Sequence, residues 1–422
     1  MIRRFCGKEV LAADIFKRGA QGDEGVRAIV LGVIERVRKE GDQALYAYAE
    51  QFDKCKLTSL EVSEQEIKDA YNATDDYFKE TLRLAADNLK RYHKEQGGKE
   101  YRIEEDGVTL GRRVLPLERV GIYVPGGTAS YPSTVLMNAV PAKIAGVKEI
   151  VMVTPPQKDG GVRKEILAAA YVAGVDRVFR VGGAQAVAAL AYGTESVPKV
   201  DKIVGPGNMY VAAAKREVFG TVDIDMIAGP SEILIVADEG ASPVVVAADL
   251  LGQAEHDRQA QAILVTTSDA LAERTAAELE RQLAELPRAS IAREAIERYS
   301  AIVTVKDTDE AIEIANAVAP EHLELMIADP ERCLDAVRHA GSVFLGYHTP
   351  EVLGDYLAGT NHTLPTNGTA RFSSPLSVED FQKKTSYLRY SRDKLEAIKD
   401  RLADFAEREG LSAHARSATK RF

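Results

Sequence analysis

The sequence predicts an α/β fold made of two lobes with parallel sheets. From about residue 100, short β-rich runs such as V-G-I-Y-V and E-I-V-M-V alternate with Ala-rich helical stretches. This alternation is typical of parallel strands joined by crossover helices. It starts again after a break at Gly229-Pro230, and a chain of 422 residues exceeds what one hydrophobic core normally supports.

The first hundred residues have a helical pattern and are rich in charge. Apolar residues recur at three- and four-residue spacing over 24–51, which predicts an amphipathic helix. A second helical stretch, roughly 63–95, contains His93 among charged and polar neighbours. We expect His93 to be a surface residue.

The strands of the first α/β stretch end in glycine-bearing turns: P-G-G at 125–127, G-G-A-Q at 182–185 and G-P-G-N at 205–208. Ligands of parallel sheets bind at the carboxyl ends of the strands. None of the turns fits G-x-G-x-x-G, because Tyr210 stands where the third glycine would be. Such glycines could admit a phosphate to helix N-termini or serve tight turns alone, and both interpretations stay open.

The second lobe repeats the pattern of strands and helices. Ser231 follows the Gly229-Pro230 break, where the chain passes from one lobe to the other. The strands are expected at 262–266, 302–305, 323–327 and 342–346, and the helices at 269–299 and 308–318.

The segment L-L-G-Q-A-E-H-D, 250–257, ends a helix that opens at Ser242-Pro243. Gln253 and His256 are three residues apart, so they lie on one face of its last turn. They could offer two ligands to one metal ion. An isolated pair of this kind is more often a solvated helix end.

Two more polar groups of residues follow. Glu321 and His322 lie between a proline and a strand. Adjacent residues of an extended chain point to opposite sides, so they cannot form a side-by-side dyad, although a bend could direct both into a cleft. A hydrogen-bonded structural histidine is the alternative. The loop 354–366 carries Asp355 and His362, and polar loops on a rigid scaffold often hold sites.

The C-terminal segment, 371–422, contains little more than one helix, expected at 392–409 and capped by Gly410. It cannot bury a core of its own and must dock on something. Glu409 and His414 near its end suit a site completed by another subunit. A frayed terminus is the default alternative.

Composition narrows the partners. The net charge of −10 argues against nucleic acid or an anionic membrane, so we expect a small-molecule substrate. Cys6, Cys55 and Cys333 are too scattered for a disulfide framework, which fits a reducing compartment. No signal peptide and no run of ~18 apolar residues is evident, so we expect a cytoplasmic protein.

The chain resembles the histidinol dehydrogenase family over nearly its whole length. The resemblance rests on motifs that occur in the family's order: G-I-Y-V-P-G-G, P-S-T-V-L-M-N-A-V-P-A, V-G-P-G-N-M-Y-V, I-A-G-P-S-E, G-Q-A-E-H-D, A-P-E-H-L-E-L, G-T-N-H-T-L-P-T and E-G-L-S-A-H.

The resemblance implies oxidation of L-histidinol through the aldehyde to L-histidine, with Zn²⁺ and two NAD⁺. By this resemblance His322 is the catalytic base and Glu321 activates water. The implied zinc ligands are Gln253, His256, Asp355 and His414, and these four residues and His322 are also expected to contact the substrate. Further substrate contacts are implied for Ser231, His362 and Glu409. The implied NAD contacts are Tyr123, Gln185 and Asn208.

The resemblance also implies an intertwined homodimer of two incomplete Rossmann-like lobes with helical N- and C-terminal extensions, in which the tail reaches the partner's site. We expect an N-terminal extension at 1–18, a lobe with the zinc and catalytic residues from 19–122 and 233–375, a lobe with the NAD contacts at 123–232, and a docking tail at 376–422.

Two alternative functions are weighed against this one. The first is a related zinc and NAD dehydrogenase acting on another polar alcohol or diol. The second is a zinc hydrolase or a non-catalytic metal-binding protein whose glycine turns are structural. The cysteines lie outside the motifs and receive no catalytic role.

Overall fold

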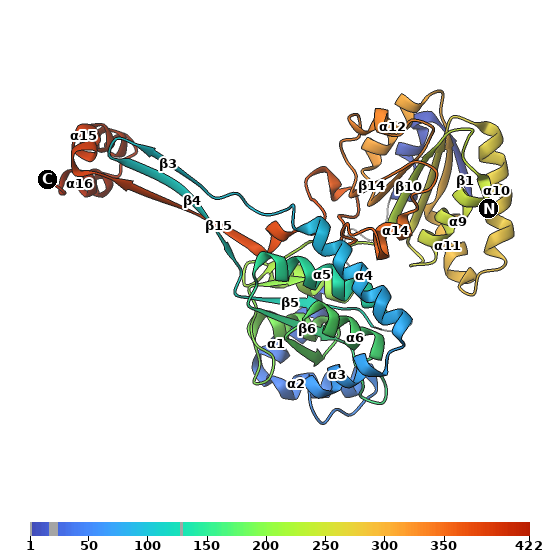
Figure 1. Cartoon of the computed structure of the whole chain (residues 1–422), viewed down its shortest axis with the longest axis horizontal. Coiled ribbons are helices and arrows are strands. Elements are labelled where there is room, and N and C mark those ends of the chain that lie inside the picture. The colour runs from blue at the N-terminus through green and yellow to red at the C-terminus, as the bar shows by residue number, and fades with distance from the viewer. Residues whose placement is uncertain (1, 17–23, 127–129) are drawn as a thin grey trace.

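The computed structural model describes residues 2–16, 24–126 and 130–422. Figure 1 shows two α/β lobes and a long arm that projects away from them. The prediction of an α/β fold with parallel sheets is confirmed. No helix in the described ranges has both the length and the apolar character of a membrane span.

The first lobe, here called the β5 lobe, is built on a six-stranded sheet of order β2-β7-β6-β5-β8-β9. Strand β2 is antiparallel to β7, and the other neighbours are parallel. The strands are β2 (Glu61–Val62), β5 (Arg119–Tyr123), β6 (Glu149–Thr154), β7 (Arg177–Arg180), β8 (Lys202–Val204) and β9 (Asp223–Ile224).

Helices cover both faces of this sheet because its strands are apolar on both sides. One apolar core joins the sheet to α3 (Glu64–Ala73), α4 (Asp76–His93), α5 (Pro132–Ala145) and α6 (Lys164–Ala173). The other joins it to α1 (Glu24–Glu40), α2 (Asp42–Tyr48), α7 (Gly183–Tyr192) and α8 (Met209–Val218). A short π-helical turn, Ala49–Asp53, follows α2.

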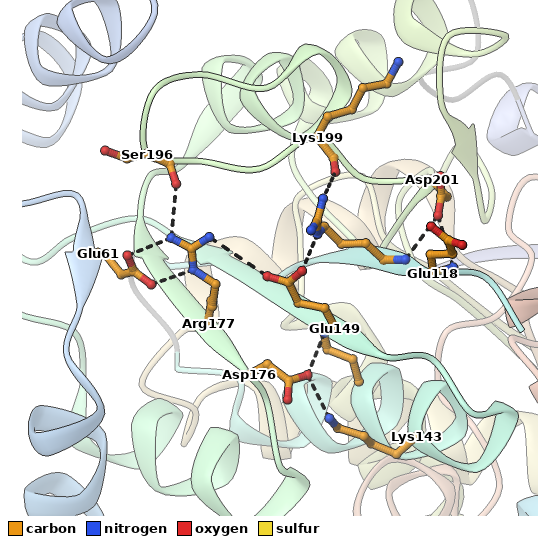
Figure 2. A network of polar contacts seen from close by, with 11 residues as sticks. Glu61, Glu118, Lys143, Glu149, Asp176, Arg177, Ser196, Lys199 and Asp201 are labelled. Atoms are coloured by element: carbon orange, nitrogen blue, oxygen red, sulfur yellow. Dashed lines mark hydrogen bonds and ion pairs between the residues drawn. The ribbon is translucent and has the colours of Figure 1, made fainter.

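Ion pairs close the amino edge of the β5 sheet (Figure 2). Arg177 at the start of β7 forms two hydrogen bonds to the Glu61 carboxylate, and Glu149 at the start of β6 pairs with Arg119. Asp176 accepts from both Lys143 and the backbone N–H of Ile150. The carboxyl edge is left for ligands.

The second lobe, here called the β10 lobe, has a fully parallel sheet of order β1-β12-β11-β10-β13-β14. Its strands are β1 (Arg3–Cys6), β10 (Glu232–Ala237), β11 (Gln261–Thr266), β12 (Ala301–Thr304), β13 (His322–Met326) and β14 (Ser342–Leu345). Its helices are α9 (Pro243–Ala254), α10 (Asp269–Leu283), α11 (Ala289–Tyr299), α12 (Thr308–Val318), α13 (Glu331–Leu334) and α14 (Glu351–Tyr356), with short 3₁₀ turns at Gly7–Ala12, Asp14–Phe16 and Thr369–Arg371.

Both lobes contain five parallel strands in the order expected of an incomplete Rossmann sheet. The orders are β7-β6-β5-β8-β9 and β12-β11-β10-β13-β14, so in each the first strand of the run lies in the middle. The order reverses between β5 and β8 in one lobe and between β10 and β13 in the other. Such reversals are where ligands bind.

The arm is a three-stranded antiparallel sheet of order β15-β4-β3, tipped by two helices. Its elements are β3 (Tyr101–Glu105), β4 (Val108–Pro116), β15 (Gln382–Tyr390), α15 (Arg392–Arg408) and α16 (Ser412–Thr419). The C-terminus lies at its tip (Figure 1). The expectation of little more than one helix beyond residue 371 is therefore wrong, because β15 pairs along its whole length with β4.

The pairing of strands corrects the predicted division of the chain. The segments 24–95 and 119–123 belong to the β5 lobe, since they supply β2 and β5, and residues 101–116 form part of the arm. None of them is part of the sheet of the lobe of residues 233–375. The N-terminal residues 2–16 are an edge of the β10 lobe because β1 pairs with β12. The tail is divided too: the 3₁₀ turn Val378–Phe381 packs in the β5-lobe core.

His93 lies where the two lobes meet, with its Nε2 3.5 Å from Asn361 Nδ2. The prediction that His93 is a surface residue is wrong. His93 is fully buried, and its Nδ1 lies 2.6 Å from Gln96 Oε1. Nearby, Asn361 donates to the carbonyl of Met137, and Asn88 donates to the carbonyl of Leu357. Residues 357–363 of the β10 lobe are thereby fastened to α4 and α5 of the β5 lobe.

A buried ion pair holds the turn that follows β8. Lys215 of α8 pairs with Asp225, and both side chains are at most 2% exposed. Lys215 also donates to the carbonyl of Gly205, and Asp225 accepts the Gly205 N–H. Gly205 has φ +107°, and a Cβ there would lie 2.2 Å from the Tyr123 carbonyl oxygen.

We expect Lys215→Met to lower the free energy of unfolding by about 3–5 kcal/mol, because it leaves the Asp225 carboxylate buried without its cation. Chemical denaturation measures this. The exposed pair of Arg281 and Glu285 provides the control, since Arg281→Met should cost less than about 1 kcal/mol. Equal losses for the two variants would contradict the assigned role of the buried pair.

Candidate active site

His322 lies at the junction of β10 and β13, where the strand order of the β10 lobe reverses. Its backbone is in register with Ile233, and its Nδ1 lies 2.9 Å from the carbonyl oxygen of Glu232. A carbonyl can only accept, so Nδ1 carries the proton in this contact. Nε2 is then left with its lone pair, and it is buried without a hydrogen-bond partner among the described residues.

Burial keeps this imidazole neutral. His322 is 4% exposed, and loss of solvent is the main cause that lowers its pKa to about 4. The nearby charge of Asp355 and the bond to Glu232 act in the opposite direction. A neutral imidazole with a free Nε2 can accept a proton from a substrate.

Glu321 and Glu232 bracket His322. The backbone N–H of Glu232 donates to Glu321 Oε2 at 2.9 Å, and the backbone N–H of Glu321 lies 3.3 Å from Glu232 Oε2. Glu321 precedes the strand, so its carboxylate turns back and Oε2 comes within 3.7 Å of His322 Nδ1. Of the two possibilities left open by the sequence, the bend applies here, because Glu321 lies just outside the extended strand.

Two acidic side chains of α14 lie near the imidazole rings of His322 and His362. Glu351 Oε1 lies 3.5 Å from His322 Nε2, and Asp355 Oδ1 lies 3.6 Å from His362 Nδ1. Atoms of His322, Glu351 and Asp355 all lie within 4.8 Å of one another, a spacing that a metal ion could bridge. Burial, followed by the neighbouring Asp355, raises the pKa of Glu351 to about 9.

The predicted metal ligands lie in two places. Asp355 is in this cluster, and His256 lines the cavity beside it with Tyr356 of α14. Gln253 is 1% exposed, and neither its amide oxygen nor its amide nitrogen has a hydrogen-bond partner in the described part of the chain. His414 is exposed on α16 at the tip of the arm, remote from the lobes of its own chain (Figure 1).

The unpartnered Gln253 amide is the observation that tests whether a metal fits. Burying an amide without a partner costs about 1–3 kcal/mol, so such groups are normally satisfied. A cation held jointly with Asp355 and His256 would satisfy the amide oxygen, and carboxylate and imidazole are normal zinc donors. The donor set therefore fits zinc.

The residues predicted to contact substrate lie around the same place, except for Glu409 at the end of α15. Ser231 directly precedes β10, and its carbonyl accepts the Gln261 N–H. His362 Nε2 lies 3.3 Å from Thr134 Oγ1. Because Thr134 is in the first turn of α5, this contact shows that the carboxyl edge of the β5 sheet faces the amino edge of the β10 sheet.

A cavity of about 320 Å³ opens beside His256. It is lined from both lobes, by Ser130, Tyr131 and Leu136 on one side and by His256, Arg288 and Tyr356 on the other. A small polar molecule fits this volume.

A larger pocket of about 880 Å³ lies at the carboxyl edge of the β5 sheet. Tyr123, Gln185 and Asn208, the three residues predicted to contact NAD, all line it. The Tyr123 hydroxyl accepts the N–H of Gly183, which has φ +64°. Asn208 Oδ1 caps α8 by accepting from Tyr210 and Val211. Of the P-G-G turn, Gly127 lies outside the described residues.

Three residues near these sites were missed in the sequence. Glu351 lies four residues before Asp355, which places both on one helical face, so a predicted helix there would have indicated it. Glu232 acts through its backbone carbonyl, which no side-chain pattern reveals. Asp53 lines the larger pocket, where burial raises its pKa to about 6.

The depressed pKa of His322 predicts a pH-dependent loss of stability. Unfolding restores the ordinary pKa of 6.5 to His322. Between pH 6.5 and about 4, this side chain therefore binds a proton in the unfolded chain but not in the folded chain. This contribution to stability is complete above pH 6.5 and decreases as the pH falls, by at most ~1.4 kcal/mol per pH unit.

Denaturation of metal-free protein between pH 7 and 4.5 measures this effect. We expect His322→Asn to have a shallower dependence on pH than the unmodified chain, by about one proton. The same substitution at His348, which is exposed and has no proposed role in the site, is the control and should leave the slope unchanged. Parallel curves for His322→Asn and the unmodified chain would contradict the assigned burial.

Comparison with known proteins identifies the family. The histidinol dehydrogenase family matches residues 16–422. The chain is 55% identical over 403 residues to histidinol dehydrogenase of Bacillus cereus, covering 95% of this chain and 93% of that protein. It is 56% identical over 397 residues to that of Geobacillus kaustophilus, covering 94% of each. A crystal structure of histidinol dehydrogenase from Elizabethkingia anophelis superposes with a TM-score of 0.94 at 40% identity, covering 100% of this chain and 98% of that one. The chain therefore belongs to the histidinol dehydrogenase family.

Proposed function

We propose that this protein oxidises L-histidinol through L-histidinal to L-histidine, reducing two NAD⁺ and consuming one water. Family membership supports the substrate. The observation that carries the chemistry is the buried His322, whose Nδ1 is occupied by the Glu232 carbonyl and whose Nε2 is free.

His322 acts as the base in the first oxidation. Its Nε2 takes the hydroxyl proton of the alcohol as a hydride leaves the carbon, and its Nδ1–H stays bonded to Glu232. The same hydrogen bond favours the protonated ring once it forms. Tyr123, Gln185 and Asn208 line the pocket that would hold NAD⁺, which would supply the hydride acceptor.

Glu321 serves the second oxidation. An aldehyde must add water before another hydride can leave, and the Glu321 carboxylate takes a proton from that water. Its position is fixed by the Glu232 N–H. The backbone carbonyl and N–H of Glu232 thus hold the base and the water-activating group, respectively, at the start of β13.

Gln253, His256 and Asp355 would hold Zn²⁺ together with His414 from a second copy of the chain. The ion would supply a fixed anchor for the substrate's imidazole and amino nitrogens. Ser231, His362 and Glu409 contact the substrate around it. Holding the aldehyde in one place allows one site to perform both steps.

The arm is what we propose to complete the site, in a homodimer. It places Glu409 and His414 far from the lobes of their own chain (Figure 1). It also leaves large apolar side chains uncovered, such as Leu388, 70% exposed, and Phe405, 67% exposed. A second copy would cover this surface and receive the tail. We propose a cytoplasmic location, in keeping with the free cysteines.

Adding L-histidinol and NAD⁺ to zinc-loaded protein should produce two NADH per histidinol, read by absorbance. His322→Asn should lower kcat by on the order of 10²–10⁴, because the base is lost. Chelation should abolish turnover and added Zn²⁺ should restore it. Faster turnover of another polar diol than of histidinol would instead assign the first alternative function, and absence of any NADH formation would reject the dehydrogenase.

Mixed subunits test the shared site. His256→Ala and His414→Ala should each be inactive alone, since each removes one predicted ligand from every site. A heterodimer of the two has one intact site, so co-expressed chains with different affinity tags should regain up to about half of the wild-type activity per purified heterodimer. Inactivity of verified heterodimers would favour a site built within one chain.

A further inference from the structure

Helix α14, which carries Asp355, begins without a cap of its own. Its N-cap residue is Pro350, whose side chain has no hydrogen-bond acceptor, so no side-chain cap forms at this helix start. The N–H of Leu353 bonds to the Pro350 carbonyl, which leaves the N–H of Glu351 to be satisfied from elsewhere. The N–H of Glu351 instead donates to Glu324 Oε1 at 2.8 Å. Strand β13 thus supplies the acceptor that the helix lacks.

This hydrogen bond joins the two elements that form the site. Glu324 is two residues after His322, so both side chains leave the same face of β13. Glu351 and Asp355 are four residues apart and share a face of α14. Close packing supports the same contact: a Cβ at Gly354 would lie 2.7 Å from the ring of Phe344, on the adjacent strand β14. Glu324 therefore lies one layer beneath His322, and Glu351 one turn before Asp355.

Packing alone does not account for an acid at this position. Glu324 is 1% exposed, and its strand neighbours in register are Ile235 and Phe344. Its Oε2 is buried and has no hydrogen-bond partner within residues 2–16, 24–126 and 130–422. An apolar side chain of similar volume at such a place would normally cost less. Burial, followed by the charge of Asp249 on α9, raises the pKa of Glu324 to about 8, so a neutral amide is its close substitute.

We propose that Glu324 is a positioning residue: its carboxyl group holds the first turn of α14 on β13 and so sets where Asp355 and Glu351 stand relative to His322. The inference rests on the proposed metal site at Asp355 and the proposed base at His322. Nothing in the family motifs above assigns Glu324 a role of this kind, since only Glu321 and His322 of A-P-E-H-L-E-L received one.

Three variants of the full chain test the proposal. Glu324→Gln keeps an oxygen acceptor, and Glu324→Leu removes it at similar volume. Ser300→Ala is the matched control, because the Ser300 hydroxyl is also fully buried in the β10 lobe and accepts a backbone N–H, that of Ala262. Glu324→Met also removes the oxygen acceptor but has a more flexible side chain, so it is a milder variant and decides the question if Glu324→Leu does not fold.

The first measurement is hydrogen–deuterium exchange over residues 351–356 of the metal-free protein. The second is the dissociation constant for Zn²⁺, determined by competition with a chromophoric chelator. We expect Glu324→Leu to speed exchange in α14 and to weaken zinc binding at least about ten-fold, while Glu324→Gln stays within about three-fold of the unmodified chain. Ser300→Ala should lower the melting temperature without either effect.

A substitution at the N-cap of α14 tests whether Glu324 acts by capping the start of this helix. Adding Pro350→Ser to Glu324→Leu gives α14 a cap of its own and should restore part of the exchange protection. Unchanged α14 exchange in Glu324→Leu, or equal zinc loss in Ser300→Ala, would overturn the proposal. If the unmodified chain binds no zinc, or Asp355→Ala binds it equally well, the proposed metal site fails, and the exchange data alone then decide the role of Glu324.

Discussion

The contact between His322 Nδ1 and the Glu232 carbonyl is the constraint on which the candidate active site depends. It exists because β10 and β13 are neighbours in the sheet, although 90 residues separate the two partners in sequence. It fixes which ring nitrogen carries the proton, and burial keeps the ring neutral. Without this carbonyl, the same histidine could adopt either tautomer, and its free nitrogen would not be defined.

Two lobes with the same strand order present opposite edges to one another. The β5 lobe follows the usual rule for parallel sheets, since its large pocket lies at the carboxyl ends of the strands and its amino edge is closed by ion pairs (Figure 2). The β10 lobe has its polar groups at the amino edge, where Glu232 and His322 begin their strands. The contact from Thr134 to His362 shows that these two edges meet. A cofactor of one lobe can thus reach a substrate of the other.

The arm separates two residues from the site that they are proposed to serve. Strand β15 follows β4 away from the lobes, so Glu409 and His414 end at the tip. The same arrangement leaves apolar side chains such as Phe405 uncovered. Within one chain, the polar groups that converge are therefore those of the β10 lobe and α5. This is why a homodimer enters the proposed function.

The sequence by itself determined the α/β class, the positions of most strands after residue 100, and the motifs that identify the family. These features depend on local periodicity and on short runs of residues, which are visible without contacts. The sequence missed β1, β2 and the three strands of the arm, because short or exposed strands have weak patterns and their pairing is decided by distant segments. It also assigned residues 24–122 to the lobe of 233–375, although they divide between the β5 lobe and the arm, since alternation predicts strands but not their neighbours. Only the tertiary structure decided that His93 is buried between lobes, that Glu321 bends back beside His322, and that Glu324 caps α14. Each of these features depends on groups that folding brings together, either from well-separated positions in the chain or through a local bend. The spacing of residues along the sequence does not show such contacts.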